Sequence, residues 1–224
     1  MDTVTGRAVE LLARLAAHDT CTISDALERT GRTGVLTGLA RVTTDRRVAG
    51  FAVPMQLGPA GEGTPAHHLG ARAVEQSDDR SVIVVAGGSE ACAGWGGLLA
   101  RAARGVGVRG VVVEGLVRDV DEAQGLDFPL FAAGVTPLTA RRRQVEVSCG
   151  EPVQVRGVAV RPGDLILADG SGVVVVPAEA AEDVLAAADQ IAAREAAMVE
   201  RLDAGERASS VMDRSYETMV EVQR

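Results

Sequence analysis

The sequence predicts an α/β domain in which parallel strand–helix units lie between helices at both ends of the chain. Short apolar runs rich in β-branched residues, such as 81–86, end in glycines and lead into helical patterns, as parallel β/α units do. After Pro137 the apolar and polar residues alternate, which is typical of half-exposed strands. The 224 residues are 46% hydrophobic and show no linker or internal repeat, so we expect residues 1–224 to form one domain.

Two helices are expected at the N-terminus. Apolar residues at helical spacing predict the first over residues 4–17. A second is predicted over 22–29, with Thr22 or Ser24 as its N-cap, because hydroxyl side chains accept hydrogen bonds from the first free N–H groups of a helix.

A strand and a long loop should follow. Residues 50–57 predict the strand, and Pro54 argues against a fully central position because proline cannot donate to a sheet. The loop, 58–70, is rich in glycine and proline and carries His67 and His68. Adjacent side chains on an extended segment point apart, so we favour a loop role for the two histidines over a metal site.

The middle of the chain predicts alternating buried strands and helices. Buried strands are expected at 81–86, 111–113 and 129–132, and helices at 95–104 and 120–126. The strand that begins at 111 should stop at its Glu-Gly pair.

The last third predicts a series of strands and one long helix. The strands are expected at 145–148, 153–155, 158–160, 165–167 and 173–176. The helix should run over 178–203 and end at Gly205, with the tail from 206 either mobile or lying on a neighbouring subunit.

Composition excludes several classes of protein. The net charge of −8 argues against a nucleic-acid binder, and the 2% aromatic content against a base-stacking surface. The three arginines of 141–143 fit a solvated turn. No apolar run is long enough to cross a membrane, no leader pattern is visible, and three scattered cysteines suit a reduced compartment, so a cytoplasmic protein is expected.

The most informative charged pair is Arg118–Asp119, which follows an apolar run and a glycine turn. An arginine offers a planar, two-pronged donor to a carboxylate, and an aspartate offers a hard oxygen to Mg²⁺ or Mn²⁺. The residues alone leave open a second interpretation, a charged pair on a solvated turn. For Glu114, Asp169 and Cys92 we favour structural roles, although Glu114 is close enough in sequence to face the same cleft.

Several motifs in order resemble the RraA-like family. This family includes class II pyruvate aldolases that act on 4-hydroxy-4-methyl-2-oxoglutarate and 4-carboxy-4-hydroxy-2-oxoadipate, a catalytically silent regulator of ribonuclease E, and members mislabelled as demethylmenaquinone methyltransferases. The motifs are TISDAL at 22–27, WGGLLA at 95–100, GVVVEGLVRDVDE at 110–122, FPLFAAGVTP at 128–137 and VRPGDLILADGSGVVVVP at 160–177.

The resemblance implies a swivelling β/β/α fold that forms a trimer or a hexamer, with active sites between subunits. It also implies that Arg118 binds the carboxylate of a 2-oxo acid and that Asp119 is a ligand of Mg²⁺ or Mn²⁺. Backbone amides of the loop Gly94, Trp95, Gly96, Gly97 and Leu98 would bind the substrate oxygens. Glu195, from the neighbouring subunit, would reach the metal through water.

One position departs from the family. Aldolase-competent members carry an acidic residue where this chain has Gly97. The resemblance therefore implies a metal-dependent lyase that forms a metal-stabilised enolate, either by retro-aldol cleavage or by decarboxylation of oxaloacetate. Because Gly97 removes an acidic residue from the metal site, we expect decarboxylase activity to survive better than aldolase activity. The alternatives are a member recruited to another reaction in a specialised pathway and a non-catalytic trimer that binds or regulates a partner.

Overall fold

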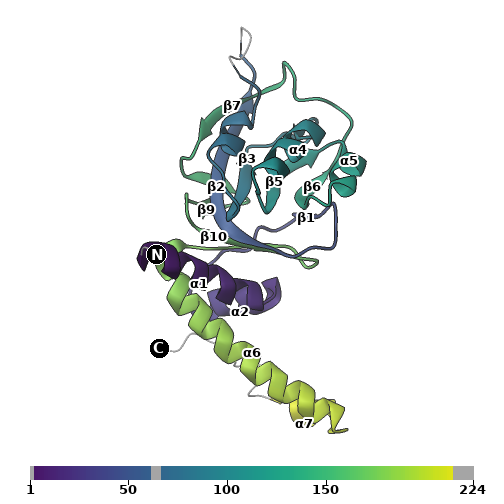
Figure 1. Cartoon of the computed structure of the whole chain (residues 1–224). Helices are drawn as coiled ribbons and strands as arrows, with labels where there is room; N and C mark the ends of the chain where they lie inside the picture. Colours follow the sequence, from purple (N-terminus) through teal and green to yellow (C-terminus); the bar gives the residue numbers. More distant parts are fainter. Residues whose placement is uncertain (1–2, 62–66, 214–224) are drawn as a thin grey trace.

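A curled mixed β-sheet forms the body of the protein, and helices α1, α2 and α6 lie beside one end of it (Figure 1). The computed structural model describes residues 3–61 and 67–213. The strands are β1 Ala40–Arg41, β2 Val48–Pro59, β3 Ser81–Ala86, β4 Ala93–Trp95, β5 Gly110–Val117, β6 Leu130–Val135, β7 Gln144–Cys149, β8 Val153–Val155, β9 Val158–Val160, β10 Leu165–Ala168 and β11 Val173–Val176. The helices are α1 Thr3–Ala17, α2 Thr20–Arg29, α3 Ala71–Glu75, α4 Gly97–Gly105, α5 Val120–Gly125, the 3₁₀ turn η1 Ala178–Ala180, α6 Ala181–Asp203 and α7 Ala208–Val211.

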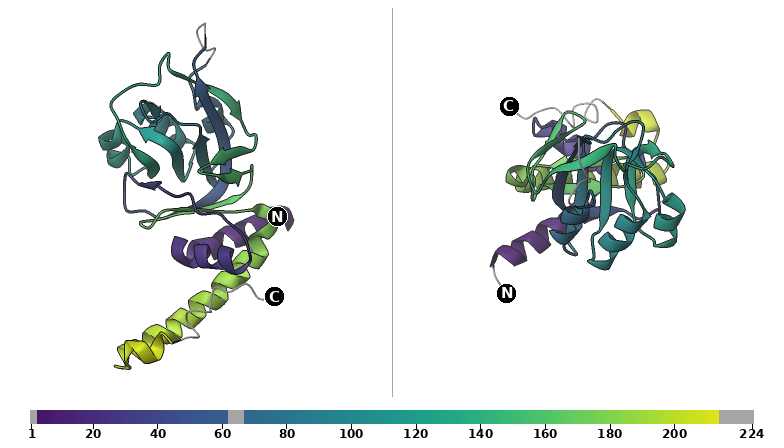
Figure 2. Two further views of the ribbon diagram at one scale, coloured as in Figure 1. Left: turned by 180° about the vertical axis from the view of Figure 1, so that it is seen from behind. Right: turned by 90° about the horizontal axis from the view of Figure 1, so that it is seen from above.

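The centre of the sheet is parallel and its flanks are antiparallel. Along the main path the strand order is β1-β6-β5-β3-β2-β10-β11, in which β6, β5, β3 and β2 run parallel. Strand β4 pairs with β5, and β7 pairs with β2, while β8 and β9 form a separate hairpin. The sheet curls strongly, as the view from above shows (Figure 2). The predicted α/β class, with helices at both ends, is confirmed.

Strand β2 is central, so the expectation that Pro54 would place it away from the centre is wrong. The strand pairs with β3 on one side and, on the other, first with β10 and then with β7. The pairing with β10 ends at Phe51 and the pairing with β7 begins at Met55. Pro54 therefore falls at the junction between two partners, where the lack of an N–H breaks no ladder hydrogen bond.

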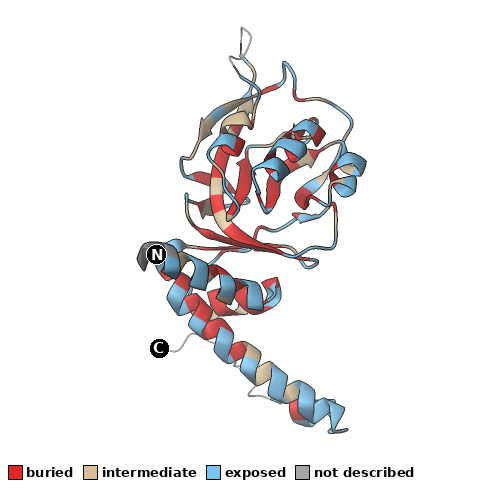
Figure 3. Ribbon diagram, viewed as in Figure 1, coloured by how far each residue is buried: buried red, intermediate tan, exposed pale blue. Residues whose placement is uncertain are grey.

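The core consists mainly of aliphatic side chains, with the aromatic residues Trp95, Phe128 and Phe131 among them, and forms three clusters. One cluster lies between the sheet and helices α3 to α5, a second inside the curl of the sheet, and a third between strands β10 and β11 and the helices α1, α2 and α6. Strand β3 is buried over its whole length, which explains its continuous run of Val and Ile. Figure 3 shows this buried interior in red.

Helix α6 has two different halves. Its first half packs against α2 through buried residues such as Val184, Leu185 and Ile191. Its second half projects away from the body, where Val199 and Leu202 are exposed (Figure 3). Among the described residues, no helix is long and apolar enough to cross a membrane.

Three boundaries differ from prediction. The N-cap of α2 is Asp19, whose carboxylate accepts from Thr22 N, so the expected caps Thr22 and Ser24 lie inside the helix. Helix α4 begins at Gly97 because Trp95 ends strand β4. Strand β5 continues through its Glu-Gly pair to Val117, with a bulge that the pairing with β6 accommodates.

Candidate functional site

The candidate site is a corner where two neighbouring parallel strands end. Strands β4 and β5 pair in parallel, with Trp95 opposite Val117, and Arg118 N donates to Trp95 O at 3.0 Å. Beyond these strand ends, Gly96 and Gly97 lead into α4, and Arg118 and Asp119 lead into α5. The carboxyl ends of parallel strands are a common place for ligands in α/β proteins.

Asp119 is held in place by the first turn of α4. Its Oδ2 accepts from Gly97 N at 3.0 Å and lies 3.3 Å from Arg118 Nε. The carboxylate therefore caps α4 from another segment, which its own sequence does not reveal. The backbone of Asp119 is left-handed, with φ 56° and ψ 38°, a conformation that aspartate tolerates better than most residues.

The glycines at 96 and 97 make room for charged side chains. A Cβ at Gly96 would lie 2.9 Å from Asp119 Oδ2 and 3.2 Å from Arg118 Nε. A Cβ at Gly97 would overlap Glu122 Oε2 and lie 3.1 Å from Asp119 Cβ. The carboxylate of Glu122 thus occupies the space beside Asp119 that a side chain at 97 would fill.

Glu122 was not singled out from the sequence. Its Oε1 pairs with Arg101 Nη2 at 2.9 Å, which ties α5 to α4. The spacing of three from Asp119 places both carboxylates on one side of the first turn of α5, and that spacing is the signal that was available. The contact with Gly97 depends on how α4 and α5 pack, so the spacing alone does not indicate it.

The corner keeps several polar groups available for a ligand. The contacts described above leave Arg118 Nη1 and Nη2, Asp119 Oδ1 and Glu122 Oε2 without a partner among the described residues. The side chains of Arg118 and Asp119 are 34% and 40% exposed. Two free guanidinium nitrogens beside two free carboxylate oxygens can bind an anion and a cation together.

The donor set fits a hard divalent cation that keeps much of its water. Asp119 and Glu122 offer two carboxylate oxygens, and Mg²⁺ is typically bound through one or two carboxylates. No group of three or more His, Cys, Asp or Glu that could hold a metal occurs within the described part of the chain. Further ligands would therefore come from water, substrate or a second copy.

The predicted loop residues divide between the core and the corner. Gly94 and Trp95 lie in β4, and Trp95 is 1% exposed within the core cluster. Gly96, Gly97 and Leu98 lie at the corner, where Leu98 is 76% exposed.

Glu195 belongs to α6, a helix that Figure 1 shows at the other end of the molecule from α4 and α5. Burial raises the pKa of its carboxyl, and the nearby carboxylates of Asp25 and Asp19 raise it further. It faces α2, so a contact with Asp119 would have to be made to another copy of the chain.

The other candidate residues have structural partners. Glu114 lies inside β5 and accepts from Gly87 N at 2.7 Å and from Arg156 N at 3.0 Å. His67 Nε2 lies 3.6 Å from the buried Glu146, and His68 Nδ1 lies 2.7 Å from Leu69 O. These contacts support the structural readings of Glu114 and of the two histidines.

Comparisons with known proteins identify the family of this chain. The family model described as RraA-like, aldolase/RraA, matches residues 20–175. A putative 4-hydroxy-4-methyl-2-oxoglutarate aldolase of Halalkalibacterium halodurans is 30% identical over 183 residues, which is 79% of this chain and 81% of that protein. Protein DlpA of Legionella pneumophila is 31% identical over 176 residues, 78% of this chain, but the match spans only 29% of DlpA.

A solved structure of an RraA protein also resembles this chain. The crystal structure of Streptomyces coelicolor RraAS2, described as an unusual member of the RNase ES inhibitor RraA protein family, superposes with a TM-score of 0.75. Its sequence is 30% identical, and the match covers 83% of this chain and 93% of that one. The fold and the corner define a mixed α/β domain with a charged site at its strand ends. The chain belongs to the RraA-like family.

Proposed function

We propose that this protein is a divalent-metal-dependent lyase that acts on a 2-oxo acid at the corner formed by Arg118, Asp119 and Gly97. The observation that carries the proposal is the pair of free nitrogens on Arg118 beside the free Oδ1 of Asp119. Relatives named as aldolases for a 2-oxo acid support it.

The substrate carboxylate is bound by Arg118 in this proposal. A guanidinium donates two parallel N–H groups to a carboxylate, and Nη1 and Nη2 are available for this. The positive end of α4 adds to the attraction, because the first N–H groups of a helix have no partner inside it. The amides of Gly97 and Leu98 lie in that first turn, although Gly97 N is already bound by Asp119.

Asp119 and Glu122 would hold Mg²⁺ or Mn²⁺. When bound there, the ion supplies Lewis-acid chemistry that stabilises negative charge left on the pyruvyl fragment as a carbon–carbon bond breaks. Asp119 is fixed by Gly97 N, so its free oxygen is preoriented. Glu122 is positioned by Arg101, which also neutralises part of its charge.

The arrangement favours decarboxylation over aldol cleavage. Aldol cleavage requires a base that removes the proton of the 4-hydroxyl group, and decarboxylation does not. Glu122 could replace the acidic side chain that position 97 lacks, because its Oε2 occupies the same space, but its Oε1 is hydrogen-bonded to Arg101. Because Arg101 holds one oxygen of this carboxylate, Glu122 is not free to turn toward the 4-hydroxyl group, so oxaloacetate should be the better substrate.

We further propose that the active form is a trimer or hexamer. The exposed Val199 and Leu202 on the projecting half of α6 support a subunit contact there. In such an assembly Glu195 of one copy would approach the water around the metal of another.

The test is pyruvate release from oxaloacetate with Mn²⁺ or Mg²⁺, and again with EDTA, corrected for the metal-only rate. We expect metal-dependent release, and for Arg118→Ala a KM raised about tenfold or more, because a charge-assisted hydrogen-bond pair is lost. Arg141→Ala removes an exposed arginine from a turn and is the matched control. Absence of release above the metal-only rate would contradict the proposal and favour a non-catalytic binding protein.

A further inference from the structure

A cleft of about 540 Å³ lies at the opposite end of β5 from Arg118. It is lined by Arg46, Arg47, Arg104 and Arg109, and we call it the arginine pocket. Arg109 directly precedes β5 and Arg118 directly follows it. At about 3.3 Å per residue, the eight residues of β5 separate the two places by about 26 Å. The arginine pocket is therefore distinct from the candidate lyase site.

Two of the four guanidinium groups are held in place by main-chain carbonyls alone, while Arg46 Nη1 donates to Asp127 O at 3.3 Å and also pairs with the Asp127 carboxylate. Arg47 Nη1 donates to His18 O at 2.6 Å, and Arg109 donates from Nε to Asp79 O at 2.8 Å and from Nη1 to Ala49 O at 3.1 Å. A carbonyl oxygen fixes the guanidinium but carries no net charge, so these hydrogen bonds do not neutralise the arginines, although Arg47 also interacts electrostatically with Asp169, which lies outside the lining. Preorganised cations of this kind lower the entropy lost when an anion binds.

The acidic residues of the cleft do not neutralise it. Asp127 Oδ2 lies 3.3 Å from Arg46 Nη1, which accounts for one arginine. The side chain of Asp79 is 84% exposed and lies nearest to Arg80, outside the lining, at 3.9 Å. Four arginines and two aspartates give the lining a formal charge of +2, in a chain whose net charge is −8.

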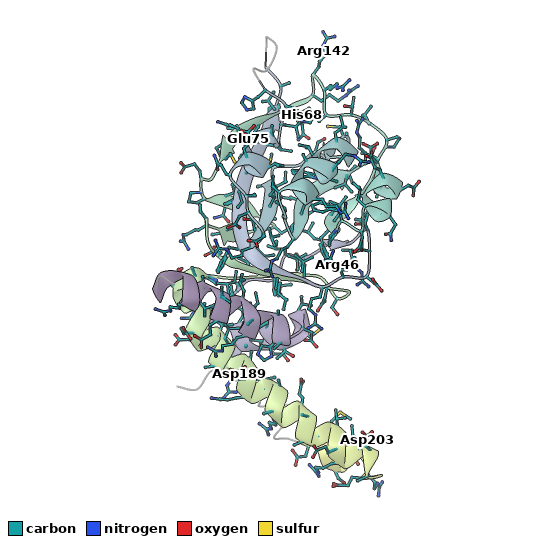
Figure 4. The ribbon with its side chains drawn as sticks, in the orientation of Figure 1. Arg46, His68, Glu75, Arg142, Asp189 and Asp203 are labelled. Carbon is teal, nitrogen blue, oxygen red and sulfur yellow. The ribbon has the colours of Figure 1, made fainter. Side chains whose placement is uncertain are left out.

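Arg104 completes the cleft from the last turn of α4. In the described part of the chain its guanidinium has no hydrogen bond or ion pair, and it is exposed. Arg46 lies at the end of the sheet nearest α1 and α2 (Figure 4), and Ala16 of α1 also lines the cleft. The segments that precede β2 and β5 and the last turn of α4 thus place four cations around one hollow, with α1 beside it.

We propose that the arginine pocket binds a small polyanion that carries two or more carboxylate or phosphate groups. Both groups accept two parallel N–H donors from a guanidinium, which explains why arginine rather than lysine lines the cleft. The volume falls within the range of about 300–1,000 Å³ that is usual for small-molecule sites. This site is independent of the proposed lyase function.

The test is isothermal titration of the metal-free full-length protein with citrate and, separately, with pyrophosphate, at constant ionic strength. The two probes distinguish a carboxylate ligand from a phosphate ligand. We expect saturable binding to the wild type and a loss of about tenfold or more in affinity for Arg104→Ala and for Arg46→Ala. Arg141→Ala, which removes an exposed arginine outside the cleft, should bind as the wild type does. In Arg118→Ala any binding of the probe at the lyase corner is removed, and the binding event that Arg104→Ala weakens should remain, which separates the two sites.

Two results would overturn the proposal. The first is that neither probe binds the wild type saturably, and the second is equal affinity of the wild type, Arg104→Ala and Arg46→Ala for the probes. In the first case, a change in oligomer mass for Arg104→Glu would assign the cleft to an acidic protein surface instead. Arg104 has no partner in the described structure, so its replacement should leave the fold intact, which circular dichroism would verify.

Discussion

Asp119 and Asp169 stand in similar places in the chain but in opposite surroundings. Asp119 follows β5 by two residues, and Asp169 follows β10 directly. Asp169 is 9% exposed and accepts three hydrogen bonds, from Thr20 N at 2.9 Å, Thr20 Oγ1 at 2.7 Å and Ser171 N at 2.9 Å. Asp119 is 40% exposed and accepts from one main-chain N–H.

Asp169 is a structural carboxylate, whereas Asp119 is available to bind a ligand. Both oxygens of Asp169 are committed, and they join the turn after β10 to the start of α2. Asp119 keeps one oxygen free and adopts a left-handed backbone, a strained state that persists at functional positions when neighbouring groups impose it. Asp169 should therefore control stability, and Asp119 should control activity.

The largest expected effect is that of Asp119→Asn on activity. Asparagine tolerates the left-handed backbone, so the fold should survive, while the hard anionic ligand is lost. We expect metal-dependent turnover of oxaloacetate to fall about 10³-fold, equivalent to about 4 kcal/mol of transition-state stabilisation. Steady-state kinetics with Mn²⁺ measure the turnover, and a urea titration measures whether the fold keeps its stability. Full turnover by Asp119→Asn would contradict the assignment of Asp119 to activity.

Asp169→Ala should have the next largest effect, and it should act on stability. The substitution leaves the buried Thr20 N–H and hydroxyl without their acceptor, which should lower the free energy of unfolding by about 2–4 kcal/mol. Urea denaturation at pH 7 measures this change. A loss below about 0.5 kcal/mol would contradict the structural role.

The same residue should give the protein an acid-sensitive stability. Burial raises the pKa of the Asp169 carboxyl, but the hydrogen bonds from Thr20 and Ser171 outweigh it and hold the pKa below its usual value. A lowered folded-state pKa contributes stability above the unfolded-state pKa of about 3.9, and this stability is lost as the pH falls through the folded-state pKa. Between pH 5 and pH 3 the wild type should therefore lose more stability than Asp169→Ala.

Gly97→Ala should give a smaller loss of activity. The added Cβ would displace the Glu122 carboxylate from the side of Asp119, and loss of a supporting group of this kind typically costs about 10–100-fold. Stability should change little, because the displaced atoms are the end of a flexible side chain. Gly105→Ala is the matched control in the same helix, since nothing lies within 4 Å of its added Cβ. Equal turnover rates for Gly97→Ala and Gly105→Ala would contradict a role of Glu122 in the site.

Glu195→Gln should have the smallest effect. The pKa of Glu195 is raised by burial and by Asp25 and Asp19, so its ionised form destabilises the fold at neutral pH. Without divalent metal, the variant should gain up to about 1 kcal/mol at pH 7, and the gain should disappear near pH 4, where the wild-type carboxyl takes up a proton. Glu200→Gln, on the exposed part of the same helix, is the control for urea denaturation.

The sequence predicted most elements but not the contacts between them. Apolar periodicity indicated α1, β3 and the long terminal helix, because those patterns follow directly from burial. The position of β2 was predicted wrongly because Pro54 fits a junction between two partner strands, which is a property of the sheet.

For the site as well, the sequence predicted neighbouring residues but not the contacts that arise from folding. Arg118 and Asp119 are adjacent, so one motif revealed them. The approach of Glu122 to Gly97 arises from the packing of α4 on α5, and the four arginines of the arginine pocket come from three separate segments. Such groupings exist only in the folded chain.

The affinity for Mn²⁺, measured by electron paramagnetic resonance of the free ion, tests most directly whether Asp119 is the available carboxylate. We expect the wild type to bind Mn²⁺, Asp119→Asn to bind it about tenfold or more weakly, and Asp169→Asn to bind it as the wild type does under conditions where it remains folded. Equal affinity of the wild type and Asp119→Asn would contradict the assignment of Asp119 as the available carboxylate.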